Sequence, residues 1–287
     1  MKRYPIQIFR FVMKRILLVC TFTLLHLPFF PFQMVAQDTL LINQSINKAI
    51  TYLNKRIEKQ ELYFYIEPIL KPIAIYYNLP IQNINLIENQ YSLKEKQLIE
   101  LFSPLFKERH FSESDKKMID SLSTIDRLML YSLYGNELYN RKYFKKNIDS
   151  LINWGQYDLS HAYLITLLQK NNRFIPRKWV SYYLSKIQPL VIKMLPEIHE
   201  HYTDLHIEVI AFLCYANVNL DSQYIVNLIA QQTPEGAWKD NPDEMNDWMN
   251  DHTTVLGLWA LLEWKYKSDS FLYLAHPQFI QRNKPLK

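Results

Sequence analysis

Three segments of this sequence are apolar on every side of a helix, and they limit the folds open to the chain. They are HAYLITLL (161–168), IEVIAFLCYA (207–216) and VLGLWALL (255–262). A helix without a polar face has to be enclosed by protein or by lipid, and these segments are too short to span a membrane. We therefore expect each of them to be a buried helix.

Amphipathic segments alternate with the apolar ones. In RKWVSYYLSKIQPLVIKML (177–195), apolar residues recur at helical spacing, and Lys178, Lys186 and Lys193 lie outside their stripe. The chain has only four glycines, and its long segments lack strict polar–apolar alternation, so we expect helices throughout. The two kinds of helix favour an all-α fold in two nested layers, with an inner ring of buried helices inside an outer ring.

An internal repeat supports this interpretation. Each apolar segment opens on an acid and a histidine, and the histidines His161, His206 and His252 recur at nearly constant spacing. That spacing suits one helical hairpin per repeat. Residues 62–77 and 123–134 resemble earlier, degenerate inner helices, which gives about five pairs in all. The inner helices are predicted near residues 158–169, 204–216 and 252–264.

The N-terminus has the pattern of an export signal. Residues 1–15 contain five basic residues and no acid, an apolar run follows, and Ala36 offers a cleavage site. We expect residues 1–36 to be a signal peptide and the mature chain to be periplasmic or secreted, without a membrane span. A retained membrane anchor is the alternative. Translation could start at Met1 or at Met13, where a second signal-like stretch begins.

Removal of residues 1–36 changes the charge of the chain. The whole sequence has 33 Lys and Arg against 28 Asp and Glu, and the segment takes five of the bases with it. The mature chain is therefore formally neutral. A nucleic-acid partner is not expected, because such proteins carry a basic surface.

The mature chain, residues 37–287, is predicted to be a single domain, since no Gly/Ser-rich linker divides it. Residues 78–92 are the best candidate for a long loop. Only Cys214 remains after cleavage, so an intramolecular disulfide is excluded. It lies within an apolar segment, and we expect it to be a small buried hydrophobe rather than a reactive thiol.

The stretch QTPEGAW (232–238) fits the pattern Q-x3-G-x-W and resembles the QW motif of terpenoid cyclases. DHTTVLGLWALL (251–262) resembles the inner helix that follows this motif in cyclase and prenyltransferase α/α-toroids. The resemblance covers roughly residues 140–265 and implies an α/α-toroid. It also implies that Trp238 packs over the next helix, that Gln232 caps a helix terminus and that Gly236 permits the turn.

The catalytic motifs of those families are not reproduced. The D-x-D-D acid motif of squalene-type cyclases is absent, which removes their general acid. DEMND (243–247) only superficially resembles a D-D-x-x-D metal motif, because it lies in a Pro/Asn-rich loop. The Asp–Cys–His zinc set of protein prenyltransferases is not matched either, since Cys214 lies well past Asp204. The resemblance therefore carries a fold and no activity.

The segment EIHEHYTDLHIE (197–208) is the densest group of metal-ligating residue types in the chain. Imidazole and carboxylate groups at this spacing could bind a divalent cation such as zinc, with His201, Asp204 and His206 as ligands. The alternative is a polar loop that enters a helix, with Thr203 or Asp204 as its N-cap.

The inner helices of a toroid run in one direction, so their N-termini meet at one mouth. We expect the repeated acid–histidine pairs to converge there and to form the catalytic or binding site. A helix N-terminus disfavours the imidazolium ion and so favours the neutral histidine that serves as base or ligand. The candidate site residues are Asp158, His161, Asp204, His206, Asp251 and His252.

Three functions remain open from the sequence. The first is an exported toroid that binds or acts on an apolar, isoprenoid-like ligand in a dry central cavity. The second is a carbohydrate-active toroid of the polysaccharide-lyase kind, with Tyr157, His161, Tyr202 and His206 as acid–base candidates beside Arg or Lys. The third is a non-catalytic toroid with a filled centre that binds a peptide or protein.

Overall fold

Helices make up nearly all the regular structure of this chain. The computed structural model describes residues 29–82, 91–105, 109, 111–135, 140–172, 175–241 and 247–266, and within these ranges it has no strand. The all-α prediction is confirmed. The elements are α2 (Phe29–Glu58), η1 (Phe64–Ile66), α3 (Glu67–Tyr76), α5 (Leu93–Leu101), η3 (Ser103–Leu105), α6 (Glu113–Asp120), α7 (Thr124–Tyr134), α8 (Arg141–Trp154), α9 (Gln156–Asn172), α10 (Arg177–Ile192), α11 (Asp204–Tyr215), α12 (Ser222–Ala230) and α13 (Asp247–Lys265).

The chain divides into two compact units, Met1–Gln44 and Ser45–Lys287. Helix α2 begins in the first unit, whose described part is helical from Phe29 onward. The rest of α2 and all the later elements belong to the second unit, which holds every feature discussed below. Residues 1–28 of the expected signal peptide, residues 83–90 of the expected long loop and residues 243–246 of the DEMND stretch lie outside the described residues.

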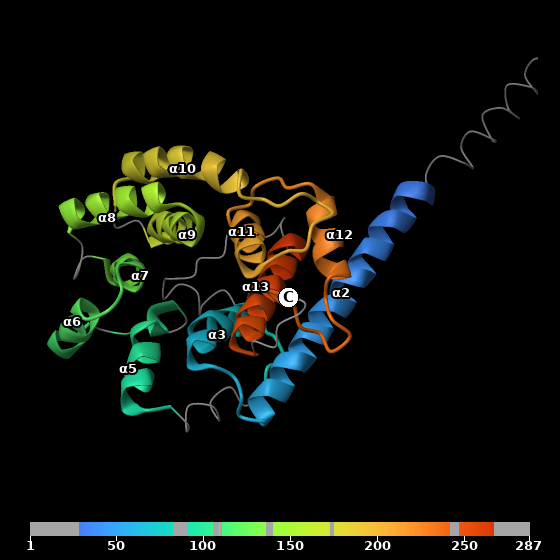
Figure 1. Cartoon of the computed structure of the whole chain (residues 1–287), viewed down its shortest axis with the longest axis horizontal. Helices are drawn as coiled ribbons and strands as arrows, with labels where there is room; N and C mark the ends of the chain where they lie inside the picture. The colour runs from blue at the N-terminus through green and yellow to red at the C-terminus, as the bar shows by residue number, and fades with distance from the viewer. Residues whose placement is uncertain are drawn as a thin grey trace, which may run out of the picture. The chain divides into compact units, whose positions relative to one another are not determined.

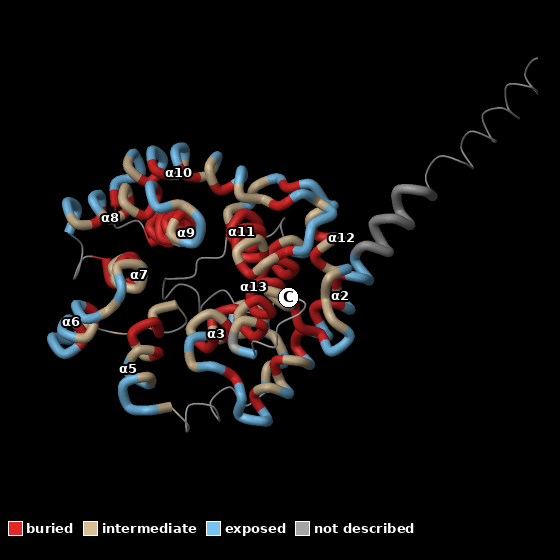
Figure 2. Tube along the Cα trace, viewed as in Figure 1, coloured by how far each residue is buried: buried red, intermediate tan, exposed pale blue. Residues whose placement is uncertain are grey.

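Helices α9, α11 and α13 form the buried layer of the second unit. Every residue of α11 from Ile207 to Tyr215 is buried, and so is every residue of α13 from Thr253 to Glu263. Helix α9 contacts α11, and α11 contacts α13. Figure 2 shows these three helices largely in the colour of buried residues. The three apolar segments are therefore enclosed by protein, including Cys214 in α11.

The amphipathic helices cover this layer. Helices α8 and α10 pack on α9, α10 also reaches α11, and α12 packs on α13 (Figure 1). Each buries one face only. In α10 the buried residues are Val180, Tyr183, Ile187 and Val191, which recur at helical spacing. Buried and covering helices alternate along the chain from α7 to α13.

The contacts between the buried elements close on themselves. Helix α13 contacts α3, α3 contacts η3, η3 contacts α7, and α7 contacts α9. Together with the α9–α11 and α11–α13 contacts, these pairs make a cycle. Both earlier segments predicted as inner helices take part in it, residues 62–77 as η1 and α3 and residues 123–134 as α7.

The QTPEGAW stretch is the turn between α12 and α13. Trp238 is 1% exposed, and its indole N–H donates to the Leu228 carbonyl of α12 at 2.7 Å. Its backbone N–H donates to Thr254 Oγ1 of α13 at 3.1 Å. The tryptophan therefore packs over the next helix, as the resemblance implied.

Gly236 and Gln232 hold the same turn against α2. Gly236 has φ +101°, and a Cβ on it would lie 2.2 Å from the Lys48 carbonyl oxygen, so no other residue fits there. The Gln232 amide donates to the Ser45 and Gly236 carbonyls, each at 3.0 Å. The resemblance implied a cap on a helix terminus. In this chain the amide instead ties the turn to the middle of α2.

None of the described helices is both long and apolar enough to cross a bilayer.

Candidate functional site

A cavity of about 250 Å³ lies among the elements of the contact cycle. Its lining comes from α3, η3, α7, α9 and α13, with η1 and α5. Most of the lining is aliphatic or aromatic, including Phe64 and Trp259. Among the described residues, the ionisable ones in the lining are Tyr65, Asp126, His161 and His252, with neither Lys nor Arg. The cavity is therefore mainly apolar and has a few polar groups at its wall.

Two of these lining residues, His161 and His252, belong to a polar cluster centred on Asp204. Asp204 is the first residue of α11 and is 1% exposed. Its Oδ1 accepts hydrogen bonds from His252 Nδ1 at 2.8 Å and from Thr253 Oγ1 at 2.7 Å. Its Oδ2 accepts from the Tyr157 hydroxyl at 3.3 Å. Helices α9, α11 and α13 thus each contribute to the cluster.

Glu208 is the second buried carboxylate of the cluster, one turn after Asp204 on α11. Ser160 of α9 donates a hydrogen bond to its Oε1. His161 Nδ1 lies 3.7 Å from the same oxygen and donates to the Tyr157 carbonyl at 2.7 Å. Asp204, Glu208 and His252 are the group of possible metal ligands found among the described residues, with one ligand atom of each within 4.8 Å of the others.

Burial and the neighbouring charges shift the protonation of this cluster. Burial, assisted by the charge of Asp204, raises the pKa of Glu208 above its ordinary value. Burial alone would favour neutral His252, but the hydrogen bond and charge of Asp204 and the charge of Glu208 outweigh it and raise the pKa of His252. Burial also raises the pKa of the Tyr157 hydroxyl, with the charge of Asp204 acting in the same direction. The cluster therefore holds protons more firmly than isolated groups would.

The structure brings together some of the residues proposed from the sequence. His161, Asp204 and His252 meet in the cluster, as does Tyr157 from the lyase hypothesis. Asp158 lies in the first turn of α9 and is partly exposed. The site as proposed from the sequence therefore corresponds only in part to this cluster.

The proposed metal set of His201, Asp204 and His206 does not share one site. His206 turns back on its own helix, where its Nδ1 accepts the Thr203 backbone N–H at 3.2 Å. Its pKa is lowered, mainly by burial. His201 is exposed, and its Nε2 lies 3.0 Å from the Asp240 carbonyl oxygen. Glu208 was not included in the ligand set proposed from the sequence. Its position four residues after Asp204 nevertheless places both carboxylates on one helix face.

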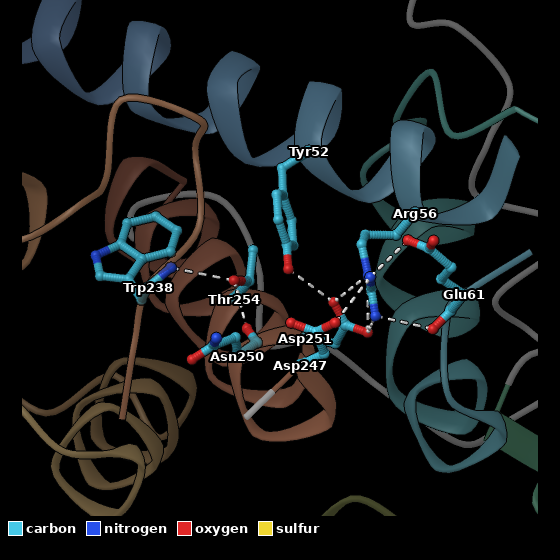
Figure 3. A network of polar contacts seen from close by, with 8 residues as sticks. All are labelled: Tyr52, Arg56, Glu61, Trp238, Asp247, Asn250, Asp251 and Thr254. Atoms are coloured by element: carbon cyan, nitrogen blue, oxygen red, sulfur yellow. Dashed lines mark hydrogen bonds and ion pairs between the residues drawn. The ribbon is translucent and has the colours of Figure 1, made fainter. Parts of the chain in front are cut away.

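Asp251 belongs to a different network, which joins α2 to α13 (Figure 3). The Tyr52 hydroxyl donates to its Oδ1 at 2.9 Å, and Arg56 Nε lies 3.0 Å from the same oxygen. Burial raises the pKa of Asp251 to about 6, even though Arg56 and Tyr52 stabilise the carboxylate. Arg56 also pairs with Glu61 at 2.7 Å. These contacts connect α2 to α13, and Asp251 is not among the residues that line the cavity.

Searches with the whole chain found no significant match to a protein-family model, to a curated protein or to a solved structure.

Proposed function

We propose that the second unit is an α/α-toroid whose central cavity binds a neutral, apolar ligand of isoprenoid type. The toroid rests on two features of the fold. Buried and covering helices alternate along the chain, and the contacts of the buried elements form a closed cycle. Export of the mature chain, expected from residues 1–36, belongs to the same proposal.

The cavity is the observation that carries the proposed function. Its wall combines aliphatic side chains with aromatic ones, which is the composition of sites for apolar small molecules. Its volume of about 250 Å³ is just below the roughly 300–1,000 Å³ of typical ligand sites, so it suits a short ligand. A cavity of this kind distinguishes the proposal from a binding toroid with a filled centre.

The charges at the wall favour a neutral ligand. Asp126 lines the cavity, and the carboxylates of Asp204 and Glu208 lie behind His252 and His161. An anionic head group would meet these acids without a Lys or Arg in the described part of the lining to compensate its charge. A hydroxyl group can hydrogen-bond to the histidines without that cost. The same lack of cations argues against a sugar-acid substrate of the lyase kind.

Binding of geraniol, a short isoprenoid alcohol, measured by isothermal titration calorimetry tests the proposal. Geranyl diphosphate is the charged comparison. Met129 of α7 lines the cavity, so Met129→Trp should fill it and weaken geraniol binding at least tenfold. Ile125→Trp is the matched control, since Ile125 is also a half-buried residue of α7 and does not line the cavity.

We expect the native protein and the Ile125→Trp variant to bind geraniol alike, and both to prefer it to geranyl diphosphate. Folding of each variant is checked by its helical circular dichroism. The proposal fails if the folded native protein does not bind geraniol, or if the filled cavity of Met129→Trp binds it equally well.

A further inference from the structure

Asp204 and Glu208 are two buried carboxylates one helical turn apart, each 1% exposed. In the described part of the chain, the ion pairs of both are with histidines, His252 for Asp204 and His161 for Glu208. A buried carboxylate is costly unless a cation or several hydrogen bonds compensate its charge. Asp204 accepts three hydrogen bonds, one of them from His252, whereas the described partners of Glu208 are the Ser160 hydroxyl and His161. Glu208 is therefore the less compensated of the two, and a cation beside it would stabilise both.

The third member of the group comes from a different helix. His252 of α13 faces Asp204 across the α11–α13 contact, with Nδ1 and Oδ1 2.8 Å apart. The candidate ligand atoms of Asp204, Glu208 and His252 all lie within 4.8 Å of one another. Zinc bonds of about 2.0–2.2 Å at tetrahedral angles place neighbouring ligand atoms roughly 3.4 Å apart. The three atoms therefore lie within about 1.4 Å of that spacing.

We propose that Asp204, Glu208 and His252 bind one divalent transition-metal cation, of which zinc is the best fit. In the bound state the cation takes the place of the proton between His252 and Asp204 and compensates both carboxylates. Imidazole nitrogen together with carboxylate oxygen suits zinc and its neighbours, whereas magnesium prefers oxygen ligands alone. The site differs from the set of His201, Asp204 and His206, of which only Asp204 is shared.

The surroundings of the three ligands support this assignment. The Thr253 hydroxyl donates to Asp204, and the Ser160 hydroxyl donates to Glu208. Hydrogen bonds of this kind fix the orientation of metal-binding carboxylates. His252 also lines the cavity, so the three ligands lie next to the cavity wall.

Titration of the chelator-treated full chain with Zn²⁺ in a calorimeter tests the proposal, without any geraniol present. We expect one Zn²⁺ per chain in the native protein. Glu208→Gln keeps the size and hydrogen-bonding of the side chain and should raise the dissociation constant at least a hundredfold, as should His252→Gln. His201→Gln and His206→Gln are the matched controls from the neighbouring segment and should change it less than twofold.

A second measurement does not depend on any variant. Bound Zn²⁺ should raise the melting temperature of the native protein, because the cation binds only the folded site. Mg²⁺ at the same concentration should not. Absence of stoichiometric Zn²⁺ binding to the folded native chain overturns the proposal, as does a loss of binding in the two controls equal to that in Glu208→Gln and His252→Gln. Geraniol binding is measured separately on the chelator-treated chain, so the two proposals can fail independently.

Discussion

The indole ring of Trp238 lies against the backbone of Gly257, and a methyl group at position 257 would come within 2.8 Å of the ring carbon Cε3. The ring fits onto α13 because this one position of the buried helix has no side chain. The indole N–H is bonded to α12, so the same residue joins two helices. Three predictions follow from this region of the fold and a fourth from the α2–α13 contact.

Replacement of Trp238 by Ala should lower the free energy of unfolding by about 3–5 kcal/mol, as for other buried large aromatic residues. The reason is the loss of a fully packed ring and of its hydrogen bond to Leu228. Trp154→Ala is the control, because Trp154 is 63% exposed. That variant should stay within about 0.5 kcal/mol of the native protein. Urea denaturation measures the free energy of unfolding of both variants. An equal loss in Trp238→Ala and Trp154→Ala would contradict the packing role of Trp238.

Gly257→Ala should also destabilise the protein, although alanine is the better helix former. The added methyl group overlaps the Trp238 ring, and overpacking of this kind costs about 1–3 kcal/mol. In the Trp238→Ala background the clash disappears, so the same substitution should be neutral or favourable there. A double-mutant cycle measures this coupling. Additive effects of the two substitutions would show that the residues do not touch.

Gly236→Ala and Gly155→Ala form a matched pair. Both glycines have positive φ, so alanine at either position costs about 1–2 kcal/mol for the backbone conformation alone. A Cβ at Gly155 meets nothing within 4 Å, whereas one at Gly236 would strike the Lys48 carbonyl oxygen. We expect thermal unfolding to show a clearly larger loss for Gly236→Ala. A larger loss at Gly155 would exclude the close approach of this turn to α2.

The Asp251 carboxyl should make stability depend on pH. Its pKa is raised from 3.8 to about 6 in the folded protein, so the folded state binds the proton more tightly than the unfolded state. The free energy of unfolding therefore falls as the pH rises from about 4 to about 6, by up to about 3 kcal/mol from this group. Asp251→Asn removes the titration. Urea denaturation gives the free energy of unfolding of both proteins at each pH in this range. Plotted against pH, the two curves should diverge, and parallel curves would contradict the raised pKa of Asp251.

The buried helices could be predicted from the sequence because their composition leaves no polar face. The segments 161–168, 207–216 and 255–262 lie within α9, α11 and α13. The turn at Gly236 could also be predicted, because a glycine two residues before a buried tryptophan marks a special backbone conformation. Both features are local, so they do not depend on how the helices are placed against one another.

The membership of the polar cluster could be predicted only in part, because it depends on the rotation of each helix about its axis. Successive helical residues point about 100° apart. Asp251 and His252 are neighbours in sequence, yet Asp251 reaches Arg56 of α2 while His252 reaches Asp204 of α11. By the same geometry His206 points away from Asp204, whereas Glu208 shares its face. Two of the three acid–histidine pairs, Asp204/His206 and Asp251/His252, are therefore divided between different surroundings.

The contact between α2 and α13 has a consequence for the order in which the chain becomes structured. Ser45 bonds to Gln232 and Tyr52 bonds to Asp251, across 187 and 199 positions of sequence. During synthesis, the residues of α2 therefore emerge long before their partners exist. Contacts so distant in sequence form late and slowly. Apolar surface that is exposed until they form is prone to aggregate. The face of α2 that packs on α13 therefore stays without these partners until α13 has been made.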